Sequence, residues 1–115
     1  MAISQAFSGT STISTTEWSL TTNTSGPDAE TTQGVFQVFI NLSNLAAGDV
    51  FEWKLYEKVL SSDSQILLTS ASFAGASGEP GWPSPTLILM HGWDMTLKKI
   101  TGTDRSITWS IRRVG

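Results

Sequence analysis

The side chains that most often carry catalysis are scarce in this sequence of 115 residues. It contains a single histidine, His91, and no cysteine. Nucleophilic catalysis needs a nucleophile, a base and an orienting group at usable spacing, and the sequence offers no such set. We therefore expect no catalytic residues and no enzymatic activity.

Acidic residues are the remaining candidates for chemistry. His91 and Asp94 are three residues apart across an expected bend, but no third ligand converges on them in the sequence, and a zinc site needs at least three protein ligands. Glu52 and Glu57 fall on opposite faces of one expected strand, so they cannot form a glycosidase pair by themselves. No loop has the spaced acidic motif of a calcium site. The sequence therefore predicts no metal site and no cofactor.

Charge and hydropathy narrow the classes of partner. Seven Lys and Arg against ten Asp and Glu give a net charge of −3, which is the wrong sign for a protein that binds by neutralising phosphates. No apolar run approaches the roughly 20 residues of a membrane-spanning helix, and residues 1–9 lack the basic start and apolar stretch of a secretory signal. We expect a protein made in the cytoplasm that binds neither nucleic acid nor membrane.

Alternation of apolar and polar residues with period two recurs along the chain, whereas helical periodicity is nearly absent. This pattern predicts an all-β fold, an antiparallel β-sandwich of about seven strands with immunoglobulin-like or jelly-roll topology, or alternatively a small barrel. The expected domain covers residues 17–115, and its expected strands are 17–21, 35–42, 49–59, 65–73, 86–91, 93–100 and 105–114.

Residues 1–16 are rich in Ser and Thr and carry no charge. Such a segment suits a flexible linker, an extended arm or an edge strand. We predict an extended polar N-terminal arm, separate from the sandwich.

Several local features add to this prediction. Phe51, Trp53, Leu55 and Val59 share one face of their strand, which is expected to face the core. Three glycines and three prolines predict a loop over residues 74–85, and residues 101–104 are expected to close a hairpin. Parity assigns four of the five tryptophans to the core: Trp18, Trp53, Trp93 and Trp109.

Trp82 differs from the other tryptophans because it stands between Gly81 and Pro83 in the expected loop. It is either a plug over one end of the sandwich or an anchor for a partner. Most of the positive charge lies in the expected final hairpin, including Arg112 and Arg113. That charge either forms a solvated face or meets an acidic partner, for which the lysine-free N-terminal arm of a neighbouring copy is one candidate.

Two blocks of the chain, residues 42–58 (LSNLAAGDVFEWKLYEK) and 91–112 (HGWDMTLKKITGTDRSITWSIR), resemble small virion proteins of tailed bacteriophages. The resemblance implies a head decoration, or cement, protein that binds the major capsid protein on the outer surface of the head and stabilises the shell. It also implies neighbouring or oligomeric copies, synthesis in the host cytoplasm and a β-rich body with an extended N-terminal segment.

On this interpretation the residues expected to contact a partner are Phe7, Ile13, Trp82, Pro83, Arg112 and Arg113. Two alternatives stay open. One is a structural component of the phage tail or neck, and the other is a carbohydrate-binding β-sandwich module.

Overall fold

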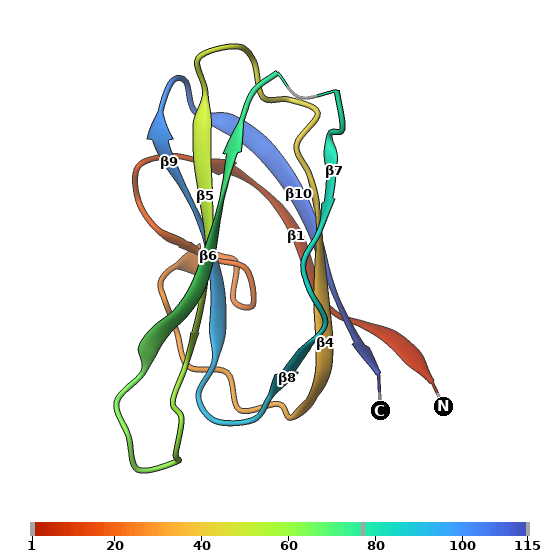
Figure 1. The fold of residues 1–115 in the computed structure, drawn as a ribbon, viewed down its shortest axis with the longest axis vertical. Coiled ribbons are helices and arrows are strands. Elements are labelled where there is room, and N and C mark those ends of the chain that lie inside the picture. Colours follow the sequence, from red (N-terminus) through yellow and green to blue (C-terminus); the bar gives the residue numbers. More distant parts are fainter. Residues whose placement is uncertain (1, 77, 115) are drawn as a thin grey trace.

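The structure, a computed structural model, describes residues 2–76 and 78–114 and contains only strands, turns and irregular segments there. Two antiparallel sheets pack face to face as a sandwich (Figure 1), which confirms the predicted all-β class. The strands are β1 (Ile3–Ile13), β2 (Trp18–Ser19), β3 (Thr24–Ser25), β4 (Gly34–Asn41), β5 (Val50–Glu57), β6 (Ile66–Ala74), β7 (Gly81–Pro83), β8 (Leu87–Leu89), β9 (Asp94–Thr101) and β10 (Arg105–Val114).

The strands divide into two sheets of five. The first sheet has the order β1-β10-β4-β7, with β8 also paired to β4, and the second has the order β3-β2-β9-β5-β6. Every pairing between these strands is antiparallel. The outer strands of the first sheet are therefore β1 on one side and β7 with β8 on the other, while β6 bounds the second sheet.

The core lies between the sheets, where alternation in the long strands places it. In β5, Phe51, Trp53 and Leu55 are at most 2% exposed, as predicted. Alternate residues of β4 and β10 are buried in the same way, and the rings of Trp93 and Phe36 meet at 4.6 Å between their centroids. Val59 is 62% exposed because β5 ends at Glu57, so its assignment to the core was wrong.

The predicted N-terminal arm is a strand of the sandwich. β1 pairs with β10 from Ile3 opposite Val114 to Ile13 opposite Arg105. Ile13 is fully buried in the core. A boundary after residue 16 therefore does not separate an arm from the domain, because the backbone of this polar segment is paired along one edge of the first sheet.

The predicted final hairpin is a crossing between the sheets, since β9 belongs to the second sheet and β10 to the first. Asp49 stands at this crossing and is 2% exposed. Its carboxylate accepts hydrogen bonds from Arg105 Nε at 2.7 Å, the Ala46 N–H at 2.8 Å and the Thr103 N–H at 3.0 Å. These bonds, the one from Arg105 foremost, lower the pKa of Asp49 to about 2.

Part of the predicted loop over residues 74–85 is also a strand. Gly81–Pro83 forms β7, in which Trp82 lies opposite Ile40 and Pro83 opposite Phe39. Proline is tolerated there because β7 is an outer strand, whose second edge needs no donor. Ser84 fixes the chain beyond it: its Oγ accepts a hydrogen bond from the Val38 N–H at 3.0 Å.

Candidate functional site

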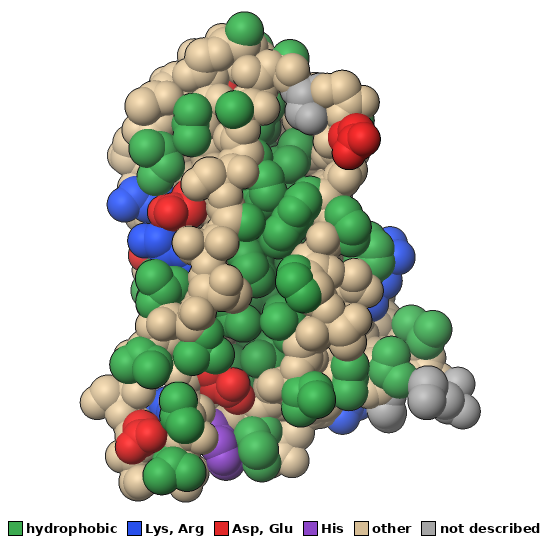
Figure 2. Space-filling view, in the orientation of Figure 1, with side chains coloured by type: hydrophobic (Ala, Val, Ile, Leu, Met, Phe, Trp, Pro, Cys, Tyr) green, Lys and Arg blue, Asp and Glu red, His purple; other side chains and the backbone are tan. Residues whose placement is uncertain are grey.

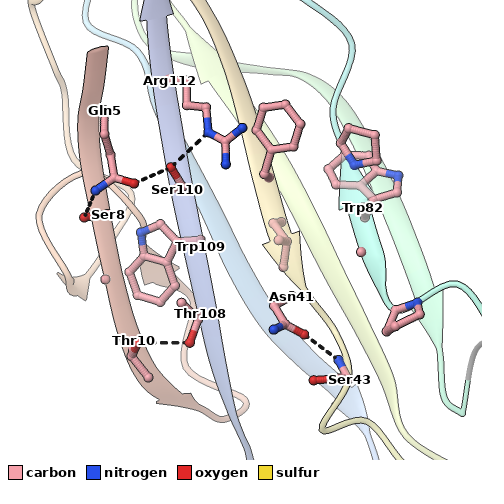
Figure 3. Close-up of a pocket in the computed structure, with 16 residues that line it drawn as sticks. Gln5, Ser8, Thr10, Asn41, Ser43, Trp82, Thr108, Trp109, Ser110 and Arg112 are labelled. Carbon is pink, nitrogen blue, oxygen red and sulfur yellow. Dashed lines mark hydrogen bonds between the residues drawn. The ribbon is translucent and has the colours of Figure 1, made fainter. Parts of the chain in front are cut away.

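The outward face of the first sheet carries a shallow trough that crosses β1, β10, β4 and β7 (Figure 3). Its volume is about 880 Å³. We call it the outer trough; it is lined by Gln5, Ser8, Gly9, Thr10, Phe39, Ile40, Asn41, Ser43, Pro80, Gly81, Trp82, Pro83, Thr108, Trp109, Ser110 and Arg112.

Strand register explains why short polar side chains dominate this face. One row across the sheet runs Ser8, Ser110, Phe39 and Pro83, each opposite the next. Successive residues of a strand point to opposite faces, so these side chains face outward because the neighbouring residues, such as buried Trp109, face the core. A second row, from Thr10 through Thr108 and Asn41 to Gly81, repeats the arrangement.

Four of the five hydroxyl side chains that line the outer trough are hydrogen-bonded to another side chain of its lining. Ser110 Oγ donates to Gln5 Oε1 at 2.7 Å, and Gln5 Nε2 donates to Ser8 Oγ at 3.1 Å. The hydroxyls of Thr10 and Thr108 lie 3.0 Å apart (Figure 3). These bonds, within β1 and between β1 and β10, hold the side chains in place, so the surface is ordered before any ligand arrives.

Arg112 supplies the charge of the outer trough and is the one ionisable residue in its lining. Its guanidinium carbon lies 4.0 Å from the centroid of the Phe39 ring, a cation–π contact. Its Nε is 3.4 Å from Ser110 Oγ. Within residues 2–76 and 78–114 neither Nη atom of Arg112 has a hydrogen-bond partner, so the trough offers a positive fork of donors that suits a carboxylate or carbonyl oxygen.

Three of the six predicted contact residues, Trp82, Pro83 and Arg112, line the outer trough. The Trp82 ring also packs inward, with centroids 5.2 Å from Trp53 and 4.8 Å from Phe73. Trp82 is therefore a plug between the sheets that contributes its outer side to the trough.

The other three predicted contacts lie elsewhere. Ile13 is fully buried and cannot reach a partner, so its assignment as a contact was wrong. Phe7 is half-buried and packs edge-on against Trp93 at 5.8 Å. Arg113 donates from Nε and Nη2 to the carbonyl oxygen of Gln33 at 2.8 and 2.6 Å, and it does not line the trough.

Sequence reasoning missed Phe39. Alternation along β4 already placed it on the face opposite Phe36 and Val38, and a large outward aromatic ring on a central strand is the signal that was available. Its role depended on Arg112, which lies 73 positions away in sequence and faces it only through the pairing of β10 with β4.

A second, smaller cavity of about 300 Å³ opens between β6 and β7, where Figure 2 shows hydrophobic side chains in the hollow between the sheets. Phe73 and Trp82 line it. Behind them the buried Nε1 of Trp53 has no hydrogen-bond partner among the residues described.

The acidic residues considered for chemistry hold the chain in place. Asp94 is fully buried and accepts hydrogen bonds from Thr21 Oγ1 at 2.8 Å and from the Asp28 N–H at 2.7 Å. Burial raises the pKa of the Asp94 carboxyl above its ordinary value. Glu57 accepts from the His91 N–H at 3.0 Å. Across the described part of the chain, no three His, Cys, Asp or Glu side chains gather as metal ligands, and no helix there is long and apolar enough to cross a membrane.

No protein-family model and no curated protein matches the sequence. Among solved structures, one that matches is described as the structure of Eiger TNF from S. frugiperda. It is 14% identical, the match covers 97% of this chain and 88% of that one, and the TM-score is 0.43.

Proposed function

We propose that this protein is a non-enzymatic structural component of a phage virion, a decoration protein that binds the major capsid protein on the outer surface of the head. The observation that carries the proposal is the outer trough, which Trp82, Pro83 and Arg112 all line. The phage context comes from the resemblance of residues 42–58 and 91–112 to virion proteins.

The outer trough has properties that suit docking to a large, rigid partner. Its floor is backbone of four paired strands, so little conformational entropy is lost on binding. Its unpartnered donors on Arg112 match the carboxylate and carbonyl oxygens that a protein surface presents. A protein that binds only the assembled shell stabilises it by mass action, and many copies add avidity without tight individual contacts.

The test is co-sedimentation of purified protein with undecorated heads of the phage that encodes it. Arg112→Glu should reduce head binding at least about tenfold, because it replaces the positive guanidinium with a negative charge that repels an acidic partner. Lys54→Glu is the matched control: Lys54 is on β5 of the other sheet and pairs with Glu52 at 3.6 Å. Unchanged binding by the Arg112 variant would refute docking through the trough.

The head and tail assignments differ in copy number. Quantitative mass spectrometry of purified virions should find the protein in hundreds of copies per particle if it covers the head. A handful of copies would replace the decoration proposal with the tail or neck alternative.

The lining of the outer trough favours carbohydrate binding as a second candidate function. Hydroxyl and amide side chains with an aromatic ring, here Phe39, are the groups that bind sugars. Adding polysaccharides should then change tryptophan fluorescence through Trp82, and the change should be lost in Phe39→Ala. Binding to heads with no fluorescence response to polysaccharides would exclude this candidate.

A further inference from the structure

Exposed large hydrophobic side chains concentrate at one end of the molecule. Nine such residues are described, and seven of them come from two short segments. The first segment contributes Val59, Leu60, Ile66, Leu67 and Leu68, which are 44–62% exposed. The second contributes Ile88 and Met90, at 81% and 46%.

Hydrogen bonds show that the two segments are neighbours in space. Glu57 Oε2 accepts from the Met90 N–H at 2.7 Å, and the Lys58 N–H donates to the His91 carbonyl at 3.0 Å. Gln65 Nε2 donates to the Gly92 carbonyl at 2.9 Å. We call the seven residues the apolar end. Hydrophobic side chains gather there around the start of β6 and near β8, in the lower part of Figure 2.

The apolar end is continuous with an unprotected sheet edge. β6 pairs only with β5, so its other side presents unpaired backbone N–H and C=O groups. Residues 64–74 contain no charge and no proline, which are two of the devices by which natural edge strands avoid pairing with other chains.

The other outer strands differ from β6. β3 has two residues, β7 and β8 have three each, and β7 includes Pro83. β1 is long, but Ile3 is its one exposed large hydrophobic residue and the rest of its exposed side is small and polar. Within the described chain, only β6 combines a long open edge with several exposed large hydrophobic side chains.

We propose that the apolar end is a self-association surface, where two copies meet about a two-fold axis with their β6 edges antiparallel near Leu67. An uncharged strand can approach its own copy without repulsion, although the whole chain carries −3. A two-fold interface uses the same patch on both copies. An axis at Leu67 lays each apolar end against the other, whereas an axis at the middle of β6 would lay it against polar Ser72 and its neighbours.

Apolar burial, rather than a long ladder of hydrogen bonds, provides the attraction. The register of β6 against β5 shifts between Leu55 and Tyr56, which leaves Leu68 as an extra residue in β6. A bulge of this kind interrupts pairing on the outer edge too. An axis at Leu67 places Ile66 opposite this extra residue of the other copy, so few backbone hydrogen bonds are expected around the axis. The proposal does not depend on head binding, because the outer trough lies on the other sheet.

Sedimentation equilibrium of the full chain tests the proposal. The wild-type mass should approach twice 12.4 kDa with rising concentration, and Leu67→Lys should remain monomeric. Ile100→Lys is the matched control: Ile100 is 45% exposed, close to 48% for Leu67, but lies outside the apolar end, so this variant should still dimerise. Circular dichroism and thermal unfolding establish that each variant is folded.

A wild-type protein that stays monomeric up to millimolar concentration would overturn the proposal, as would equal dimerisation of both lysine variants. Single cysteines locate the axis, since the chain has none of its own. Leu67→Cys should form an intermolecular disulfide on mild oxidation. Ser72→Cys should not, because at about 3.4 Å per residue two copies of position 72 would lie roughly 34 Å apart. Cross-linking through position 72 alone would refute the axis. The two proposals can fail separately. If the self-association test fails but Leu67→Lys still sediments with heads, the decoration proposal stands.

Discussion

Substituting Gly9 tests the packing of the first sheet, because two opposing effects can be compared there. Gly9 lies in β1 opposite Trp109, whose ring is 1% exposed. A Cβ at position 9 would be 2.8 Å from Trp109 Cζ2 and 3.3 Å from Asn23 Nδ2. Distances this short force a buried ring to move, which makes the substitution a case of overpacking.

The expected sign of the change in stability follows from the sizes of these two effects. Replacing glycine by alanine at a compatible position stabilises by about 0.4–1 kcal/mol, because the unfolded chain loses freedom. Overpacking a well-ordered core costs about 1–3 kcal/mol. Gly9→Ala should therefore lower the free energy of unfolding by about 1–2 kcal/mol, which corresponds to a fall in Tm of roughly 4–8 °C for a domain of this size.

Urea denaturation followed by tryptophan fluorescence measures the effect, and Gly81→Ala is the control. Gly81 also lies in a strand of the first sheet, but a Cβ there would meet nothing within 4 Å, so this variant should be neutral or slightly stabilised. If Gly9→Ala were as stable as wild type, the ring of Trp109 would not be held where the structure places it.

Four further substitutions test other parts of the fold. The depressed pKa of Asp49, about 2 against 3.8, gives stability that is present above pH 3.8 and lost as the pH falls through 2; Asp49→Asn should have a lower Tm and a flatter acid limb, and an unchanged limb would contradict this. Trp109→Phe removes a 2.8 Å hydrogen bond to a backbone carbonyl and should lower the free energy of unfolding, measured by urea denaturation, by about 2–4 kcal/mol. Trp53→Phe should cost roughly 1 kcal/mol less, because Trp53 Nε1 has no partner among the described residues. A larger loss for Trp53→Phe than for Trp109→Phe would contradict this. Ser84→Ala should cost about 1–2 kcal/mol of unfolding free energy in calorimetry, and a neutral result would show that the chain after β7 is held by other contacts.

Period-two alternation was sufficient to predict the central strands. In β5 the large apolar residues Phe51, Trp53 and Leu55 alternate with Glu52 and Lys54, so they could be assigned to the core from sequence, and they are at most 2% exposed. The signal works because this face buries enough apolar area to determine which way the strand is turned.

The same signal failed where side chains are small or the partner is distant. β1 is mostly Ser, Thr, Gly and Ala, and its pairing with β10 joins residues about 100 positions apart. The start of β6 gives a misleading signal of another kind. It has three consecutive apolar residues, Ile66, Leu67 and Leu68, which cannot all face one side of a strand. The outer trough could not be predicted from the sequence for the same reasons. Its rows of side chains come together only through the register of β1, β10, β4 and β7.

The turn between β9 and β10 shows why local turn signals do not determine topology. Thr101 to Asp104 has the composition of a hairpin turn, yet the chain leaves one sheet there and enters the other. Asp49, more than 50 positions earlier, makes the difference by bonding Thr103 and Arg105. Gly102 has φ of +99°, and a Cβ there would lie 2.7 Å from the Asp49 Cα, so glycine lets the crossing close onto the carboxylate. The crossing places β10 in the first sheet, where its pairing with β4 brings Arg112 to Phe39 in the outer trough.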